Sequence, residues 1–365
     1  MKTQRVMLIS GFLGSGKTTT MVSMAEFMRS QGKVCALITN DLGSNLVDTN
    51  FVASHHVPVV EISDGCLCHD VPQTVASFEK LSLENPDLII FEPVGCCVDM
   101  VRQVYVDLQK NYPEEYELAP VTAVVDPIRY QAIVMQEGEN TLPRESAYMF
   151  ERQLAEAEIF LLNKTDLLTD NEIKAITQSL NENYPDVTVI PICAKDGIGF
   201  DKWAEHILSG KKSKIKSLVM DWDLVFVGAK KMGWYNCSNK IAGINNKRVD
   251  MNIFINDLMI QIKEELKKQS IEAVHLKAIV KSGDQFAKAA LTSLKNDIFV
   301  SHTMNTPVPD AALVINIRAV ATPETLSAII SSTMNDVMNK NNIQLLEGAY
   351  QSFTSMDEAP VPVTI

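Results

Sequence analysis

Short apolar runs alternate with longer amphipathic stretches over residues 1–209 of the chain. The apolar runs are rich in β-branched residues, and they are Val6–Ser10, Val34–Thr39, Val57–Ile62, Leu88–Phe91, Val121–Val125, Ile159–Leu162 and Val187–Pro191. Helical patterns between them include Thr18–Gln31, Val98–Lys110, Arg144–Ala155 and Asn171–Tyr184. Strands that lack polar alternation and are separated by helices are typical of a mostly parallel sheet covered on both faces. We therefore expect a doubly wound α/β domain that binds its ligand at the carboxyl ends of the strands.

The pattern changes after the lysine-rich stretch 210–217, which we interpret as a solvated linker. Apolar residues at helical spacing predict helices at Met251–Gln269 and Pro323–Asn339. Other runs predict strands at Trp222–Val227, Ala273–Lys281, Asn296–Ser301 and Ala311–Ile317. This order predicts a smaller α+β domain over 218–346, with a split βαβ sheet and two helices on one face. Residues 347–365 are rich in Ser, Pro and acid, which predicts a tail that is poorly ordered or strapped across the surface.

Composition excludes several classes of protein. The 365 residues are 46% hydrophobic, which fits two domains with real cores. A net charge of −12 argues against a nucleic-acid surface, because phosphate neutralisation requires clustered Lys and Arg. No apolar run reaches the roughly 18 residues that span a bilayer, and we interpret the first residues as a strand followed by a glycine loop rather than as a secretory signal. Seven cysteines, an odd number in uneven clusters, fit a reducing compartment, so we expect a cytoplasmic protein.

A glycine-rich segment links the first predicted strand to the first predicted helix. Residues 11–18, GFLGSGKT, match G-x-x-x-x-G-K-[ST] in the context that the motif requires. Glycines let successive backbone N–H groups surround a phosphate, and the helix N-terminus adds its positive end. The lysine can reach the β- and γ-phosphates, and the threonine hydroxyl can bind Mg²⁺. The predicted phosphate-binding residues are Gly14, Ser15, Gly16, Lys17, Thr18 and Thr19.

A second motif, N-K-x-D, follows a later strand and indicates the base. The Asp166 carboxylate can accept hydrogen bonds from N1–H and the exocyclic amine of guanine, a pair of donors that adenine lacks. Asn163 can reach the N7/O6 edge, and the stem of Lys164 can cover the ring. After the next strand, Ala194 lies where a backbone N–H could meet O6. The motif therefore favours GTP over ATP.

Acidic residues follow two other strands. Glu92 ends the fourth predicted strand, where a carboxylate would hold Mg²⁺ directly or through water, and the Gly95 amide could sense the γ-phosphate. The loop after the second strand carries Asp41 and Asp48, either of which could position water or bind Mg²⁺. An ordinary solvated loop fits each of these two nearly as well. We expect Lys17, Asp41 and Glu92 to be the catalytic residues.

The heptapeptide DGCLCHD places two thiols and an imidazole within four positions. Thiolate and imidazole are good ligands for Zn²⁺, Co²⁺ and Ni²⁺. Cys66 and Cys68 point the same way in an extended segment, and His69 could add a nitrogen. Cys96 or Cys97 could fill the remaining coordination position, although an adjacent pair of this kind is more often explained by packing or coincidence. A C-x-C redox pair is the alternative to a metal site.

The motifs GFLGSGKTT, GCLCH, E-x-x-G and NKTDL come in the order seen in CobW-type GTPases, and residues 5–209 resemble that family. Its relatives are SIMIBI-class P-loop GTPases that insert nickel into urease and hydrogenase or service cobalamin-dependent mutases. The resemblance implies slow, Mg²⁺-dependent GTP hydrolysis coupled to delivery of a metal or metallocofactor, often through a homodimer that shares one metal between two Cys/His loops. This sequence departs from the family pattern at His69, where the C-x-C-C signature has its third cysteine, and at Asp41, where a glutamate is usual.

Three functions remain open. The leading one is a GTP-hydrolysing metallochaperone or metallocofactor-assembly factor that delivers Zn, Co or Ni to a client metalloprotein, with the second domain recognising the client or capping the metal loop. An alternative is a GTPase that activates or loads a corrinoid protein, in which the cysteines are structural. Another is a regulatory GTPase without a transition metal.

Overall fold

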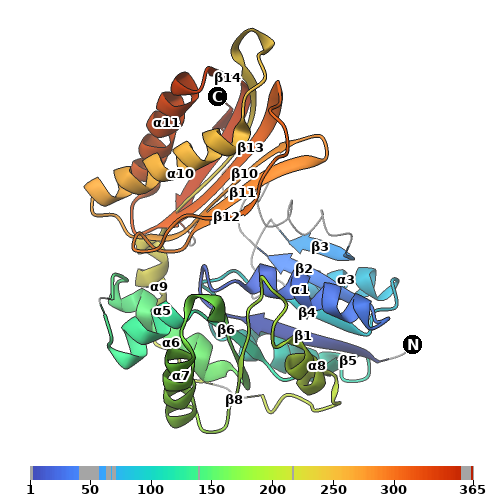
Figure 1. Cartoon of the computed structure of the whole chain (residues 1–365). Coiled ribbons are helices and arrows are strands. Elements are labelled where there is room, and N and C mark those ends of the chain that lie inside the picture. The colour runs from blue at the N-terminus through green and yellow to red at the C-terminus, as the bar shows by residue number, and fades with distance from the viewer. Residues whose placement is uncertain are drawn as a thin grey trace. The chain divides into compact units, whose positions relative to one another are not determined.

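The computed structural model of the chain describes residues 3–40, 57–62, 67, 71–138, 140–215, 218–354 and 363–364. Two compact units make up the chain, which Figure 1 colours from blue to red. Among the described residues, those up to Val225 form the first unit and those from Phe226 form the second, so the division falls within helix α9 (Trp222–Lys231). No helix of the described part is long and apolar enough to cross a bilayer.

The first unit is built on a parallel sheet with strand order β3-β2-β4-β1-β6-β7-β8, and β5 also pairs with β1. Its strands are β1 (Gln4–Ser10), β2 (Cys35–Asn40), β3 (Val59–Ile62), β4 (Leu88–Phe91), β5 (Tyr116–Leu118), β6 (Thr122–Val125), β7 (Ile159–Leu162) and β8 (Thr188–Pro191). All seven strands predicted for this half of the chain are confirmed to within two residues. The three-residue strand β5 carries too short an apolar pattern to be recognised.

Helices cover both faces of this sheet. They are α1 (Lys17–Ser30), α3 (Val71–Ser82), α4 (Val106–Asn111), α5 (Pro127–Tyr130), α6 (Arg144–Glu156), α7 (Asp170–Asn183) and α8 (Phe200–Leu208), with π turns η1 (Val101–Tyr105) and η2 (Gln131–Met135) and the 3-10 turn η3 (Thr165–Leu167). Alternate residues of β1 enter two different cores, Met7 and Ile9 packing with α1 and α8, and Val6 and Leu8 packing with α3 and η1. This two-sided burial confirms the doubly wound α/β fold and explains why its strands are apolar throughout.

The second unit is an antiparallel sheet with strand order β12-β11-β10-β13-β9-β14-β15. Its elements are β9 (Gly233–Gly243), η4 (Ile244–Asn246), α10 (Met251–Lys268), β10 (Ala273–Ser282), β11 (Gln285–Leu291), β12 (Phe299–His302), β13 (Asp310–Ala319), α11 (Pro323–Lys340), β14 (Ile343–Thr354) and β15 (Val363–Thr364). β9 and β10 are joined through α10 and flank β13, and β13 and β14 are joined through α11 and flank β9. These two interlocked split βαβ units, with both helices on one face (Figure 1), confirm the predicted α+β architecture.

Two predictions for the second half are wrong. Trp222–Val227 belongs to helix α9 and not to a strand, because the Asp221 carboxylate accepts a hydrogen bond from Leu224 N at 3.1 Å and starts the first turn. A short apolar run cannot by periodicity alone be assigned to a helix or a strand. The second wrong prediction is the poorly ordered or strapped tail from residue 347, because its described residues up to Thr354 belong to β14, which pairs with β9 along its length.

The predicted limits of the domains and of the linker stay a prediction. The described part of the lysine-rich stretch lies along the first unit, where Ser213 N donates to Leu118 O at 2.9 Å and the Ser213 hydroxyl donates to Glu158 at 2.5 Å. Arg5 donates to Lys211 O at 2.7 Å. These bonds hold the described part of the stretch against β1, β5 and Glu158, all in the first unit.

Candidate nucleotide-binding site

The P-loop connects β1 to α1 in a conformation that demands glycine. Gly16 caps the helix with φ 100° and ψ 20°, in the left-handed region. A Cβ atom on Gly16 would lie 2.4 Å from Nδ2 of Asn163, so no larger residue fits without moving that side chain. Ser15 N donates to Phe12 O at 3.1 Å and tightens the turn. The first turn of α1 carries no acidic residue, so its N-terminal amides remain suited to an anion.

Two side chains of the loop are poised for a polar ligand. Lys17 Nζ donates to Gly11 O at 2.7 Å and thus folds back over the loop. The Ser15 hydroxyl is buried and makes no hydrogen bond with any described residue. A buried hydroxyl without a bond is costly, and a ligand oxygen would remove that cost. Thr19 is half-buried in the first turn of α1, beside the two buried residues that precede it.

A hydroxyl and a carboxylate meet where the sequence predicts that the phosphates bind. Thr18 Oγ1 donates to Glu92 Oε1 at 3.0 Å, and both residues are buried. Glu92 is held at the end of β4 because its N–H donates to Ile38 O at 3.0 Å. Two adjacent oxygen ligands fit Mg²⁺, which prefers hard oxygen donors and keeps several of its waters. Asp41, predicted to act at this edge, lies outside the described residues.

The loop after β4 lies against the P-loop. A Cβ atom on Gly95 would be 2.7 Å from a methyl of Leu13 and 3.0 Å from Lys17 Nζ, so the backbone approaches the lysine as only glycine allows. Cys97 N donates to Val94 O at 2.8 Å and closes the turn around Gly95. Gly95, predicted to sense the γ-phosphate, therefore lies next to Lys17, predicted to bind it.

Asn163 ties three loops together. Its Nδ2 donates to Ser15 O at 2.9 Å, and its Oδ1 accepts from Ala194 N at 3.0 Å. The sequence predicted that Asn163 and the Ala194 N–H would both face the base. In the structure the Asn163 side chain and the Ala194 N–H bond to each other. Asn163 is therefore a buried structural residue that links the P-loop, the N-K-x-D loop and the loop after β8. Their contacts with guanine stay a prediction.

Lys164 is positioned by a residue that sequence reasoning missed. Its Nζ donates to Gly14 O at 2.9 Å and to Asp126 Oδ2 at 2.5 Å. Asp126 also caps α5 by accepting from Ile128 N and Arg129 N. Burial by itself would raise the pKa of Asp126, but Lys164, Arg129 and these hydrogen bonds outweigh it and hold that pKa below its usual value. The signal was present in the sequence, since Asp followed by Pro after an apolar strand is typical of a helix start.

Asp166 is exposed beside the loop after β8. Its two carboxylate oxygens lie 3.2 Å from Lys195 Nζ and 3.4 Å from the Cys193 sulfur. Cys193 also lies 3.0 Å from Asp196 Oδ2, so these three residues form a cluster of metal-ligand types. Burial, followed by Asp196, raises the pKa of the Cys193 thiol to about 11. A protonated thiol that donates to carboxylates supports Asp166 and is a poor ligand for a soft metal.

The predicted metal stretch is described at one residue. Cys66, Cys68 and His69 lie outside the described residues, and Leu67 between them is buried. Leu67 N donates to Asn40 Oδ1 at 3.1 Å, while Asn40 Nδ2 donates to Ile62 O at 2.8 Å. The backbone at Leu67 is thereby anchored to the carboxyl end of β2, the edge at which the residues predicted to bind nucleotide also lie.

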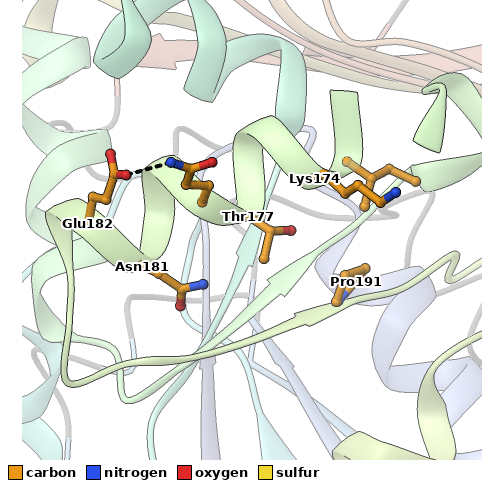
Figure 2. A pocket seen from close by; sticks show the side chains of 7 residues that line it. Lys174, Thr177, Asn181, Glu182 and Pro191 are labelled. Atoms are coloured by element: carbon orange, nitrogen blue, oxygen red, sulfur yellow. Dashed lines mark hydrogen bonds between the residues drawn. The ribbon is translucent and has the colours of Figure 1, made fainter. Parts of the chain in front are cut away.

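A surface groove lies away from these residues. One face of α7 and the end of the edge strand β8 line it (Figure 2), and Gln178 donates to Glu182 at 2.8 Å along its rim. Its lining residues are Ile173, Lys174, Thr177, Gln178, Asn181, Glu182 and Pro191. It contains none of the residues predicted to bind nucleotide or metal.

The chain is similar in sequence to curated proteins of metal handling. It is 29% identical over 196 residues to "Zinc chaperone CobW" of Sinorhizobium sp, an alignment covering 48% of this chain and 54% of that protein. It is 28% identical over 189 residues to "Zinc chaperone YeiR" of Escherichia coli (strain K12), covering 51% and 54%. It is 26% identical over 209 residues to "Hydrogenase maturation factor HypB" of Azotobacter chroococcum mcd 1, covering 56% and 60%. The chain thus spans little more than half the length of these relatives.

A family model covers the nucleotide site as a whole. It is described as CobW/HypB/UreG, nucleotide-binding domain, and it matches residues 5–191, just over half of the 365 residues. The match runs from β1 to the last residue of β8 and includes both the P-loop and the N-K-x-D motif. The chain therefore belongs to the CobW/HypB/UreG family of nucleotide-binding domains, as the order of its motifs predicted.

Proposed function

We propose that this protein is a Mg²⁺-dependent GTPase that couples slow GTP hydrolysis to delivery of a transition metal to a client protein. The observation that carries the nucleotide part is the pair of bonds between the N-K-x-D motif and the P-loop. Asn163 Nδ2 lies 2.9 Å from Ser15 O, and Lys164 Nζ lies 2.9 Å from Gly14 O. These bonds support a single site with a phosphate end and a guanine end.

At the guanine end, Asp166 would select the base. Lys195 and Cys193 each engage one of its oxygens from the side, which leaves lone pairs for N1–H and the exocyclic amine of guanine. The carboxamide of Asn163 donates one of its two N–H groups to Ser15 O, so the other would donate to N7 of guanine. The stem of Lys164 would cover the ring.

At the phosphate end, Lys17 would exchange its bond to Gly11 O for phosphate oxygens. Thr18 and Glu92 would hold Mg²⁺, which when bound neutralises charge on the β- and γ-phosphates. Backbone amides around Ser15 and Gly16 would surround the β-phosphate. Asp41 would position the attacking water.

The metal part of the proposal is supported by the names of the relatives, two of which are zinc chaperones and one a hydrogenase maturation factor. Cys66, Cys68 and His69 would be the ligands of the cargo metal, Zn²⁺, Co²⁺ or Ni²⁺. The anchoring of Leu67 by Asn40 supports a link between these ligands and the nucleotide edge. Release of the γ-phosphate near Gly95 would change their geometry and free the metal. The second unit would recognise the client, and two copies of the chain could share one metal.

The test is a comparison of nucleotide and metal binding on the same preparation. GTP but not ATP should be hydrolysed, and Zn²⁺, Co²⁺ or Ni²⁺ should bind with different affinities in the GDP state and with a non-hydrolysable GTP analogue. Cys66→Ser and Cys68→Ser should lose the metal and keep GTP binding, while Cys35→Ser, a buried core thiol, serves as the control that keeps both. Equal metal affinities in the two nucleotide states would refute the coupling of GTP hydrolysis to metal delivery. If no metal binds in either state, the protein would be a GTPase without a metal cargo.

A further inference from the structure

Helix α6 holds the loop that follows β4 through one side chain. Gln153 Nε2 donates to Gly95 O at 3.0 Å and to Cys97 O at 2.9 Å. A carboxamide nitrogen carries two hydrogens, so both donors of Gln153 are committed to this loop. The partners are 58 and 56 residues away along the chain, so the contact is purely tertiary.

Gln153 lies on the buried side of an amphipathic helix. It is 1% exposed and neighbours the buried residues Met149, Phe150 and Leu154 of the same helix. Its Oε1 makes no hydrogen bond with any described residue. Burying a carboxamide with one end unbonded is unfavourable, and an apolar side chain would fill the same space without that cost. Packing alone therefore does not account for glutamine here, whereas its two bonds to the loop do.

Together with one backbone hydrogen bond, those bonds hold the peptide groups on both sides of Gly95. The carbonyl of Gly95 is held by Gln153, and the preceding carbonyl, Val94 O, accepts from Cys97 N at 2.8 Å. Because peptide groups are planar, fixing Val94 C=O also fixes the direction of the Gly95 N–H in the same plane. Cys97 is in turn held through its own carbonyl by Gln153. Gln153 thus holds two carbonyls of the turn beside Lys17, and through Cys97 it supports the bond that holds the Val94 carbonyl.

We propose that Gln153 is the positioning residue for the γ-phosphate contact: it orients the Gly95 N–H toward the terminal phosphate of GTP. This inference rests on the proposed GTPase function and extends it, because it states how the site distinguishes GTP from GDP. Gln153 does not touch the nucleotide. It acts through the turn that its two hydrogen bonds hold in place, so its loss should affect the triphosphate and spare the diphosphate.

The test is binding and turnover of Gln153→Met and Gln153→Leu, which replace the carboxamide by an apolar side chain of similar volume and so remove both donors. Affinity for a non-hydrolysable GTP analogue and kcat should each fall roughly ten-fold, since two neutral hydrogen bonds are lost, while GDP affinity stays within about two-fold. Gln178→Met is the matched control, because Gln178 is an exposed glutamine on α7 whose side chain bonds to Glu182. It should change none of these values.

Equal losses for GDP and the GTP analogue, or no loss for either, would overturn the positioning role. Failure of the wild-type chain to bind GTP would instead refute the proposed function. If neither variant folds, amide hydrogen exchange on the wild-type chain decides. The GTP analogue should slow exchange relative to GDP both in residues 94–98 and in the last turns of α6. A response confined to the loop would contradict the proposal.

Discussion

Replacing Glu156 by glutamine should remove a strong pH dependence from the stability of the first unit. Glu156 ends α6 and is buried near Asp99, which is itself buried two residues before η1. Burial, with the negative charge of Asp99 next in importance, raises the pKa of Glu156 to about 8. The backbone N–H groups of Met100, Val101 and Asp99 favour the charged form, but none completes a well-formed hydrogen bond with the carboxylate.

The sign and size follow from linkage. The folded chain keeps a proton on Glu156 up to about pH 8, whereas the unfolded chain loses it near its ordinary pKa of 4.5. The contribution of Glu156 to stability is therefore fully present below pH 4.5 and is lost as pH rises through about 8. The pKa difference of about 3.5 units, from 4.5 to about 8, corresponds to a loss of at most about 5 kcal/mol. Glutamine is neutral throughout and has no such loss.

The assay is calorimetric unfolding of wild type and Glu156→Gln from about pH 5 to about pH 9, with the transition of the first unit identified by its shift on adding GDP. The variant should gain stability relative to wild type as pH rises and be the more stable protein at the alkaline end. Glu151→Gln, which removes a partly exposed carboxylate from the same helix, should run parallel to wild type. Parallel curves for Glu156→Gln would refute the idea that this carboxyl stays protonated in the fold.

Other substitutions test the nucleotide site and its supports. Asp166→Asn should weaken GTP binding by about 1.5–3 kcal/mol in titration calorimetry, because an amide cannot accept from both guanine donors. Glu92→Gln should raise the Mg²⁺ concentration for half-maximal GTP hydrolysis and leave metal-free GDP binding unchanged; an unaltered Mg²⁺ curve would exclude Glu92 as a ligand. Asn163→Ala should lower the unfolding free energy by about 2–4 kcal/mol, since it leaves Ser15 O and Ala194 N without their bonds. Leu67→Ala should cost about 2–5 kcal/mol and weaken Zn²⁺ binding at the adjacent cysteines; retained Zn²⁺ affinity would show that the anchor does not matter to them.

The sequence predicted the first unit better than the second for a physical reason. Strands of a parallel sheet covered on both faces are apolar at nearly every position, so β4 and β7 were located to the residue. In the second unit, β9 buries Asn236 and Asn239, and β14 buries Gln351. Asn236 accepts hydrogen bonds from Arg318 and Asn316 on the neighbouring strand β13, and such buried polar residues interrupt the apolar pattern by which a strand is recognised.

The candidate site likewise has two kinds of residue: those in motifs of consecutive residues, and those that the fold brings together from distant parts of the chain. The P-loop and N-K-x-D motifs were recognised because their chemistry lies in consecutive residues next to a strand end. Asp126 and Gln153 were missed because each acts on residues far along the chain, Asp126 on Lys164 and Gln153 on Gly95. Both are buried side chains whose hydrogen bonds hold a loop of the candidate site. Neither is itself predicted to contact the ligand. The motifs predicted to touch the nucleotide are therefore recognisable in the sequence, whereas the distant side chains that bond to them become visible only in the structure.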